Sequence, residues 1–184
     1  MPTSALQEQM RGAGLEVLGF CERLSQWPGL MQDSTLLQDF RAEEVDVVGS
    51  LMLHVRAQPG QILIKEGDVD DWMMLLLRGT VDVGKRLGPD AEPEVRGDNT
   101  RLAVLRTGSV LGEMSMFDGE PRYASCWALS EVEAAVLDKA AVGRLIHARP
   151  EIGAKLLVKL TQLLAQRLRN TSSQLVKALR RHAE

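Results

Sequence analysis

The stretch that decides the fold is residues 58–83, QPGQILIKEGDVDDWMMLLLRGTVDV. Its short apolar runs are separated by three pairs of turn residues, Pro59-Gly60, Gly67-Asp68 and Arg78-Gly79. QILIK holds a short apolar run between two polar residues, and MMLLL has the length of a buried strand. Short strands between closely spaced turns are typical of a β-sandwich or a β-barrel.

Strand-like segments continue on both sides of this stretch, from about residue 54 to residue 137. Their number, about eight, predicts a mainly β protein: an eight-stranded antiparallel β jelly roll, or double-stranded β-helix. Residues 87–100, LGPDAEPEVRGDNT, are polar and rich in Pro, Gly and Asp, and we interpret them as a long exposed hairpin loop.

Helical patterns flank the strands. Residues 4–26 are predicted to be helical, and Ser34 is predicted to cap a short helix that leads into the first strand. We therefore divide the chain into an N-terminal helical extension (1–30), a jelly-roll domain (31–138), and a C-terminal hinge helix followed by a long helix (139–184).

The long helix carries a stripe with a seven-residue repeat. Its positions are spaced alternately by four and three residues: Leu157, Thr161, Leu164, Leu168, Thr171, Leu175 and Ala178. Such a stripe either packs on the barrel of its own chain or forms the seam of a homodimer. The spacing leaves both alternatives open.

The charge is unevenly distributed. The 184 residues carry a net charge of −3, which argues against general nucleic-acid binding, yet residues 144–184 hold nine Lys/Arg against two Asp/Glu. That segment is either a solvated helix face or a docking surface for an acidic protein partner. The N-terminus lacks the pattern of a signal peptide, and the run WMMLLL is too short to span a membrane, so a cytoplasmic protein is expected.

The sequence contains no pattern that indicates an enzyme. His54, His147 and His182 are scattered, so neither a catalytic pair nor the histidine cluster of a metal-binding jelly roll is predicted. Cys21 and Cys126 lie far apart without metal-ligand spacing, and they are expected to be buried thiols in a reducing compartment. Walker and dinucleotide-binding glycine patterns do not occur.

One polar segment between strands offers better chemistry. Residues 111–126, LGEMSMFDGEPRYASC, hold Glu113 at the end of a strand and Arg122 nine residues later. The planar guanidinium of an arginine suits two phosphate oxygens, and a carboxylate accepts hydrogen bonds from hydroxyl groups, as a sugar phosphate requires. The competing interpretation is a loop salt bridge between Glu113 and Arg122.

This segment, GEMSMFDGEPRYAS, resembles the phosphate-binding cassette of cyclic nucleotide-binding domains. A Gly-Glu pair begins the cassette, small and apolar residues follow, and a Pro-Arg-x-Ala unit ends it. The resemblance extends over roughly residues 30–170, because Gly60, Gly67 and Gly79 match the family's turns and the flanking helices match in order. Tyr123 is a departure, since a small residue usually follows the arginine.

The resemblance implies a role for each cassette residue. Arg122 would bind the cyclic phosphate with help from cassette backbone N–H groups, and Glu113 would accept from the ribose 2′-hydroxyl. Tyr123 would stack on the purine or take its place, unless it faces outward as an ordinary strand residue. The implied ligand-binding residues are Gly112, Glu113, Met114, Ser115, Arg122, Tyr123 and Ala124, and the implied apolar walls are Leu63, Val81, Val83, Leu105 and Val110.

The expected function is a regulatory sensor that binds a cyclic nucleotide, cAMP ahead of cGMP, and signals through the C-terminal helices without catalysis, cofactor or metal. A ligand-independent interaction or dimerisation module on the same fold, and the sensor part of a Crp/Fnr-like transcription regulator, are the alternatives. The chain ends at Glu184, so we expect no DNA binding by this chain alone.

Overall fold

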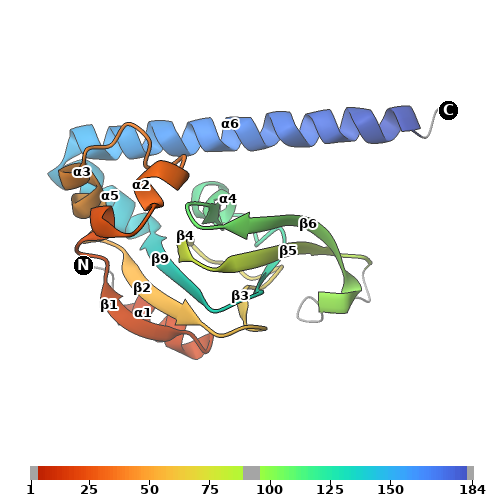
Figure 1. The fold of residues 1–184 in the computed structure, drawn as a ribbon, viewed down its shortest axis with the longest axis horizontal. Coiled ribbons are helices and arrows are strands. Elements are labelled where there is room, and N and C mark those ends of the chain that lie inside the picture. Colours follow the sequence, from red (N-terminus) through yellow and green to blue (C-terminus); the bar gives the residue numbers. More distant parts are fainter. Residues whose placement is uncertain (1–3, 89–95, 182–184) are drawn as a thin grey trace.

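The computed structural model describes residues 4–88 and 96–181, and it contains two antiparallel sheets that pack face to face (Figure 1). The first sheet has the strand order β1-β2-β9-β4-β7 and the second the order β3-β8-β5-β6. Strands β2 to β9 form the predicted eight-stranded jelly roll. The bounds are β1 Glu16–Phe20, β2 Leu53–Ala57, β3 Ile62–Ile64, β4 Trp72–Arg78, β5 Thr80–Arg86, β6 Asn99–Arg106, β7 Val110–Leu111, β8 Ser125–Ala128 and β9 Val132–Asp138.

Strand β4 explains why one apolar run lacks polar alternation. Met73, Leu75 and Leu77 lie in the core between the first sheet and the helices. Trp72, Met74 and Leu76 lie in the second core, inside the barrel. Because successive side chains of a strand point to opposite faces, a strand covered on both faces must be apolar throughout.

The prediction of one helix over residues 4–26 is wrong. Helix α1 (Ser4–Gly12) ends before Gly14, which has φ +79°, and residues 16–20 then form β1, which pairs antiparallel with β2. A short 3₁₀ helix, η1, follows at Leu24–Gln26. The N-terminal segment therefore adds a ninth strand to the jelly roll, because backbone groups next to the edge of β2 gain hydrogen bonds by pairing.

The prediction that Ser34 caps a following helix is also wrong. Ser34 is buried and stands at the C-terminal end of α2 (Leu30–Asp33), and its N–H donates to the carbonyl of Leu30. The next helix, α3 (Ala42–Gly49), begins after Arg41, whose backbone N–H donates to Glu44 Oε2 at 2.8 Å. Glu44, the third residue of α3, thus satisfies a donor at the helix N-terminus.

Two helices follow the barrel. Helix α5 (Lys139–Ala148) is capped by Asp138, whose Oδ1 accepts from the N–H of Ala141 at 2.6 Å. Helix α6 (Pro150–Arg181) begins with its proline, where the missing N–H costs no helical hydrogen bond. The first turns of α6 are anchored in the core by Ile152, Leu156 and Leu160. By contrast, every residue from Leu168 to Arg180 is exposed to solvent.

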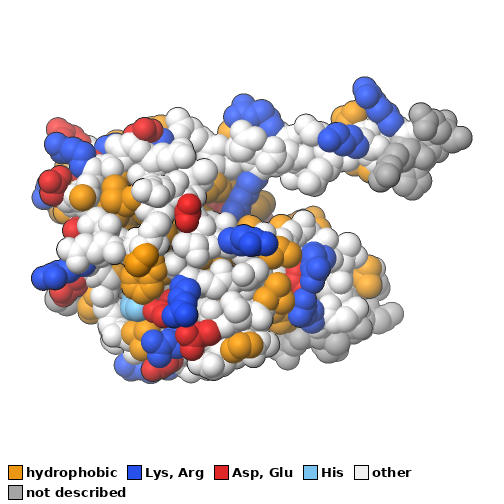
Figure 2. Space-filling model, viewed as in Figure 1, with side chains coloured by type: hydrophobic (Ala, Val, Ile, Leu, Met, Phe, Trp, Pro, Cys, Tyr) orange, Lys and Arg blue, Asp and Glu red, His pale blue; other side chains and the backbone are white. Residues whose placement is uncertain are grey.

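The distal half of α6 projects along the molecule over the β5–β6 side of the barrel, and Figure 2 shows a hollow beneath it. The leucines of the predicted stripe pack on the same chain only in the first half of α6, where Leu157 and Leu164 are half-buried. Beyond them, Leu168 and Leu175 are exposed. The predicted loop over residues 87–100 begins with exposed Leu87 and includes the 3₁₀ helix η2 (Arg96–Asp98), and its centre, 89–95, lies outside the described residues. Its last two residues, Asn99 and Thr100, already belong to β6, so the loop was predicted two residues too long. Within 4–88 and 96–181, no helix has the length and apolar character needed to cross a membrane.

Candidate ligand-binding site

The segment between β7 and β8 forms one short helix, α4 (Glu113–Asp118), bounded by two glycines in the left-handed conformation. Gly112 has φ +76° and Gly119 has φ +73°, a region that side chains disfavour. A Cβ at position 112 would stand 2.7 Å from Arg122 Nη1 and 2.9 Å from Ile64 Cδ1. Only glycine therefore lets the backbone approach the arginine so closely.

This segment borders a cavity of about 400 Å³ between the barrel and α6. All seven residues that the cassette resemblance singles out line it: Gly112, Glu113, Met114, Ser115, Arg122, Tyr123 and Ala124. Its volume lies within the range of small-molecule sites. The fold thus brings the predicted site residues together around one space.

Arg122 lies at the base of the cavity and is only 2% exposed. Its guanidinium donates to the carbonyls of Gly112 (2.6 Å) and Trp72 (2.8 Å) and to Asp70 Oδ2 (3.3 Å), and it stacks 4.2 Å above the Trp72 ring. Burial lowers the pKa of this guanidinium, and the charge of Asp70 opposes that shift. These hydrogen bonds use three of its five N–H groups.

Glu113 is 1% exposed, and its partner comes from α6. Arg167 Nη1 donates to Glu113 Oε1, while Nη2 of the same guanidinium donates to the carbonyl of Val110. The alternative of a loop salt bridge between Glu113 and Arg122 is therefore wrong, because each pairs with another residue. The second carboxylate oxygen, Oε2, is buried and has no hydrogen-bond partner among the described residues.

Helix α6 contributes side chains that sequence reasoning missed. Besides Arg167, three polar residues of α6 line the cavity: Asn170, Thr171 and Gln174. Their spacing places them on one helix face, one turn after another. Thr171, one of the two threonines in the stripe, was the one signal, but its spacing gave no reason to place it over the cassette.

The apolar walls agree only partly with the prediction. Val83 and Leu105 line the cavity, whereas Leu63, Val81 and Val110 are buried in the core and stand outside its lining. Residues of β3, β6, β7 and β8 take their place: Ile64, Leu102, Ala103, Leu111 and Cys126. A one-residue difference in register exchanges the two faces of a strand, which explains Ile64 in place of Leu63.

Tyr123 lies at the rim of the cavity and is 59% exposed. Lys85 Nζ stands 4.5 Å from the centroid of its ring and donates to its carbonyl oxygen at 2.8 Å. Lys85 also donates to buried Glu66 at 2.8 Å. Lys85 therefore connects the end of the cassette to β5. The Tyr123 ring lies at the exposed rim and does not fill the cavity.

The thiols have the environment of structural residues. Burial raises the pKa of both Cys21 and Cys126 to about 12, so neither is a thiolate near neutral pH. Cys126 borders the cavity as a neutral apolar group. Among the described residues, no three His, Cys, Asp or Glu side chains are grouped so that they could hold a metal ion.

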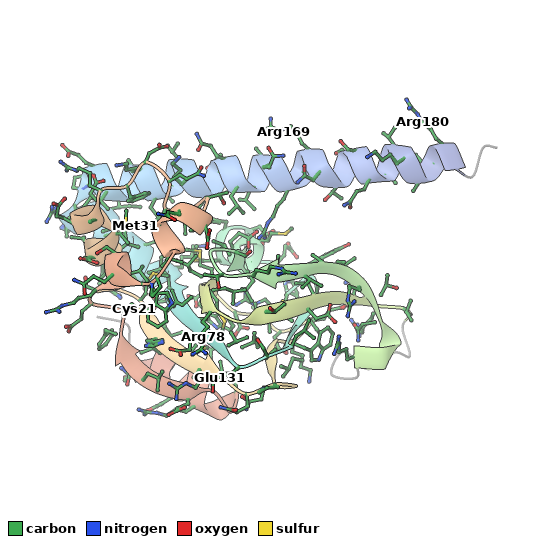
Figure 3. All side chains as sticks on the ribbon, viewed as in Figure 1. Cys21, Met31, Arg78, Glu131, Arg169 and Arg180 are labelled. Atoms are coloured by element: carbon green, nitrogen blue, oxygen red, sulfur yellow. The ribbon has the colours of Figure 1, made fainter. Side chains whose placement is uncertain are left out.

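Four cations of the basic C-terminal segment pair with acids of the same chain. Arg144 pairs with Asp138 at 3.8 Å and Lys155 with Glu44 at 2.6 Å. Lys159 pairs with Asp39, and Arg167 pairs with Glu113. Figure 3 shows that Arg169 and Arg180 point away from the barrel. An acidic protein partner stays a prediction, and outward-pointing cations such as Arg169 and Arg180 are the ones that such a partner would contact.

Comparison with known proteins identifies the family. Residues 54–149 match the model of the cyclic nucleotide-binding domain. A CRP-like cAMP-activated global transcriptional regulator of Mycobacterium tuberculosis is 34% identical over 116 residues, which are 63% of this chain and 47% of that protein. A cAMP-dependent protein kinase regulatory subunit of Yarrowia lipolytica is 25% identical over 128 residues, which are 70% of this chain and 32% of that subunit. The chain thus spans less than half of each of these relatives.

Solved structures agree with the fold. A cyclic nucleotide-binding domain from Methylobacillus flagellatus superposes with a TM-score of 0.79 at 31% identity, over 96% of both chains. The catabolite activator protein of Thermus thermophilus superposes with a TM-score of 0.66 at 28% identity, over 77% of this chain and 62% of that one. The first likeness covers the flanking helices as well as the barrel.

Proposed function

This chain belongs to the cyclic nucleotide-binding domain family, and from that premise we propose that it is a regulatory sensor that binds a cyclic nucleotide in the cavity between the cassette and α6. The ligand is cAMP ahead of cGMP. The protein senses the ligand and catalyses no reaction on it.

One observation carries the proposal: a buried carboxylate oxygen without a partner lies in the same cavity as a buried arginine. Glu113 Oε2 needs a donor, because an unsatisfied buried acceptor costs about 1–3 kcal/mol. A ribose hydroxyl is such a donor. Arg122 has two N–H groups left for the two exocyclic oxygens of a cyclic phosphate.

The charges of the cavity fit the same ligand. Among the residues that line it, Arg122 and Arg167 are cationic and Glu113 is anionic, so they sum to one positive charge. A cyclic nucleotide carries one negative charge on its phosphodiester. The apolar wall of Ile64, Leu102 and Leu111 suits the flat faces of a base, and the amides of Asn170 and Gln174 can donate to or accept from its edge.

The ranking of cAMP ahead of cGMP rests on the relatives. Both the Mycobacterium tuberculosis regulator and the Yarrowia lipolytica subunit are named for cAMP, whereas a Caenorhabditis elegans relative at 27% identity is named a cGMP-dependent protein kinase. The amide groups on α6 serve adenine and guanine alike, so the cavity itself does not rank them. Because the chain spans 47% of the regulator, transcriptional control is not part of the proposal.

Calorimetric titration with cAMP, cGMP and 5′-AMP tests the proposal. We expect cAMP to bind with a Kd of about 1–10 μM or tighter, cGMP more weakly, and 5′-AMP weakest, because its open phosphate carries extra charge and a different shape. Absence of heat with either cyclic nucleotide, at about 50 μM protein, would overturn the sensor and favour a ligand-independent interaction module.

Signalling would run through α6. Glu113 offers one carboxylate oxygen to Arg167 of α6 and the other to the ligand, so a single side chain links the two. Ligand binding changes the position of α6 only if the ligand prefers one helix arrangement over another. The shared carboxylate supplies such a preference, because ligand and helix then fix the same group.

We further propose that the distal half of α6 forms the seam of a parallel homodimer with a second copy of the chain. Leu168 and Leu175 of the heptad stripe are 69% and 59% exposed, and the stripe continues to Ala178. An isolated helical segment of that length is only marginally stable in water. A heptad repeat is the pattern by which two identical helices bury such a stripe.

Sedimentation equilibrium tests the seam. We expect the chain to be dimeric at micromolar concentration and the variant Leu168→Lys/Leu175→Lys to be monomeric, since each copy would bury two charges in the seam. Val158→Lys is the matched control, because Val158 is equally exposed on α6 but outside the stripe. A wild-type chain that sediments as a monomer at about 100 μM would contradict the seam.

A further inference from the structure

The N-terminal helix presents one face to the barrel. Leu6 and Met10 of α1 are buried in the same core cluster as Trp72, the residue on which the Arg122 guanidinium stacks. Gln9 lies three residues after Leu6 and adjoins Met10, so it stands at the solvent-exposed edge of that face. The apolar contacts of α1 thus determine where the Gln9 amide lies.

The Gln9 amide meets the acid that pairs with Arg122. Gln9 Nε2 donates to Asp70 Oδ1, while Asp70 Oδ2 accepts from Arg122 Nε at 3.3 Å. Each oxygen of the Asp70 carboxylate therefore has its own partner. The Asp70 side chain is 12% exposed, so little water competes for these oxygens.

The backbone around Asp70 is attached to the same arginine. The N–H of Arg122 donates to the carbonyl of Asp68 at 2.8 Å, and the N–H of Gly67 donates to the carbonyl of Arg122 at 2.9 Å. Backbone hydrogen bonds thus join the turn between β3 and β4 to the end of the cassette. This backbone pairing does not by itself fix the side chain of Asp70, which can still rotate. The hydrogen bond from Gln9 restricts that rotation.

We propose that Gln9 is a positioning residue of the anion site: α1 fixes the Asp70 carboxylate, which in turn orients the guanidinium of Arg122 toward the cavity. This inference rests on the proposed function, since it assigns the N-terminal segment a role in holding the same ligand. It explains why a helix outside the jelly roll packs beside Trp72. A guanidinium held in place before binding loses less freedom when it meets a phosphate.

The variant Gln9→Met tests the proposal, because methionine keeps the length and packing of glutamine but cannot donate. Gln7→Met, on the same helix, is the matched control. Two measurements are made: the hydrogen-exchange rate of the Arg122 Nε–H by nitrogen-15 NMR in the ligand-free protein, and the Kd for cAMP by calorimetry. We expect Gln9→Met to raise the exchange rate and to weaken cAMP binding by about three- to tenfold, the size of one hydrogen bond.

A background variant separates positioning from general damage. If Gln9 acts through Asp70, then Gln9→Met in an Asp70→Ala background has no further effect on the Kd, whereas damage to packing would add to it. Exchange at Arg122 Nε–H that is unchanged in Gln9→Met, or effects that add fully to those of Asp70→Ala, would overturn the proposal. If the wild type binds no cyclic nucleotide, the proposed function fails, and the exchange measurement still decides whether Gln9 positions Arg122.

Discussion

Replacing Arg122 by alanine is expected to weaken cAMP binding by about a thousandfold and to lower the free energy of unfolding by about 2–4 kcal/mol. The affinity falls because the cyclic phosphate loses two charge-assisted hydrogen bonds. The stability falls because the guanidinium also satisfies the carbonyls of Gly112 and Trp72 and the carboxylate of Asp70. The two losses come from different N–H groups of one side chain.

Calorimetry with cAMP and urea unfolding measure the two losses separately. Arg122→Lys keeps the charge but not the fixed set of donors, so we expect it to weaken binding by about ten- to a hundredfold. Arg78→Ala should change neither quantity appreciably, because Arg78 is exposed, pairs with Glu131 and does not line the cavity; Figure 3 labels both residues. Binding by folded Arg122→Ala within about threefold of the wild type would mean that the anion is held elsewhere.

The cassette was predictable because its determinants are local. Gly112, Glu113 and Arg122 lie within eleven residues, and the resemblance to the family's phosphate-binding cassette, not their spacing alone, singled them out. The alternation of turns and apolar runs similarly predicted the jelly roll. In β4 the run WMMLLL is apolar throughout because helices cover one face and the barrel interior the other.

The partners of these residues were not predictable, because each lies far away in the sequence. Arg167 is 54 residues from Glu113, and Asp70 is 52 residues from Arg122. Spacing alone therefore favoured a pair between Glu113 and Arg122, whereas the fold gives each a distant partner. The strand β1 was missed for the same reason. The pattern near Leu15 and Leu18 suggested a helix, but pairing with the distant strand β2 stabilises an extended conformation instead.

The helix α6 illustrates how a local pattern can carry two functions. Its stripe of Leu164, Leu168, Thr171 and Leu175 follows a seven-residue repeat. Thr171 also lines the cavity, together with Asn170 and Gln174 on the neighbouring face. The proposed dimer seam and the proposed ligand contacts therefore lie on the same helical turns. If both proposals hold, a ligand and a second copy of the chain contact the same helix, so each would bias the position of that helix for the other.

Replacing Glu113 by alanine is expected to abolish discrimination between cAMP and 2′-deoxy-cAMP. In the wild type, the missing hydroxyl should weaken binding by about ten- to a hundredfold, because it leaves Glu113 Oε2 buried without a donor. In Glu113→Ala that acceptor is absent, so both ligands should bind equally and weakly. Calorimetric titrations of both proteins with both ligands form the complete cycle.

Glu120→Ala is the matched control, because Glu120 is an exposed acid of the same segment and should leave the ratio unchanged. A wild-type ratio that persists in Glu113→Ala would show that the hydroxyl meets another group. The same variant removes the partner of Arg167, so hydrogen exchange along α6 beyond Leu164 should become faster. If ligand and helix share Glu113, cAMP should slow that exchange in the wild type and leave it unaffected in Glu113→Ala, which is the reciprocal coupling that a sensor requires.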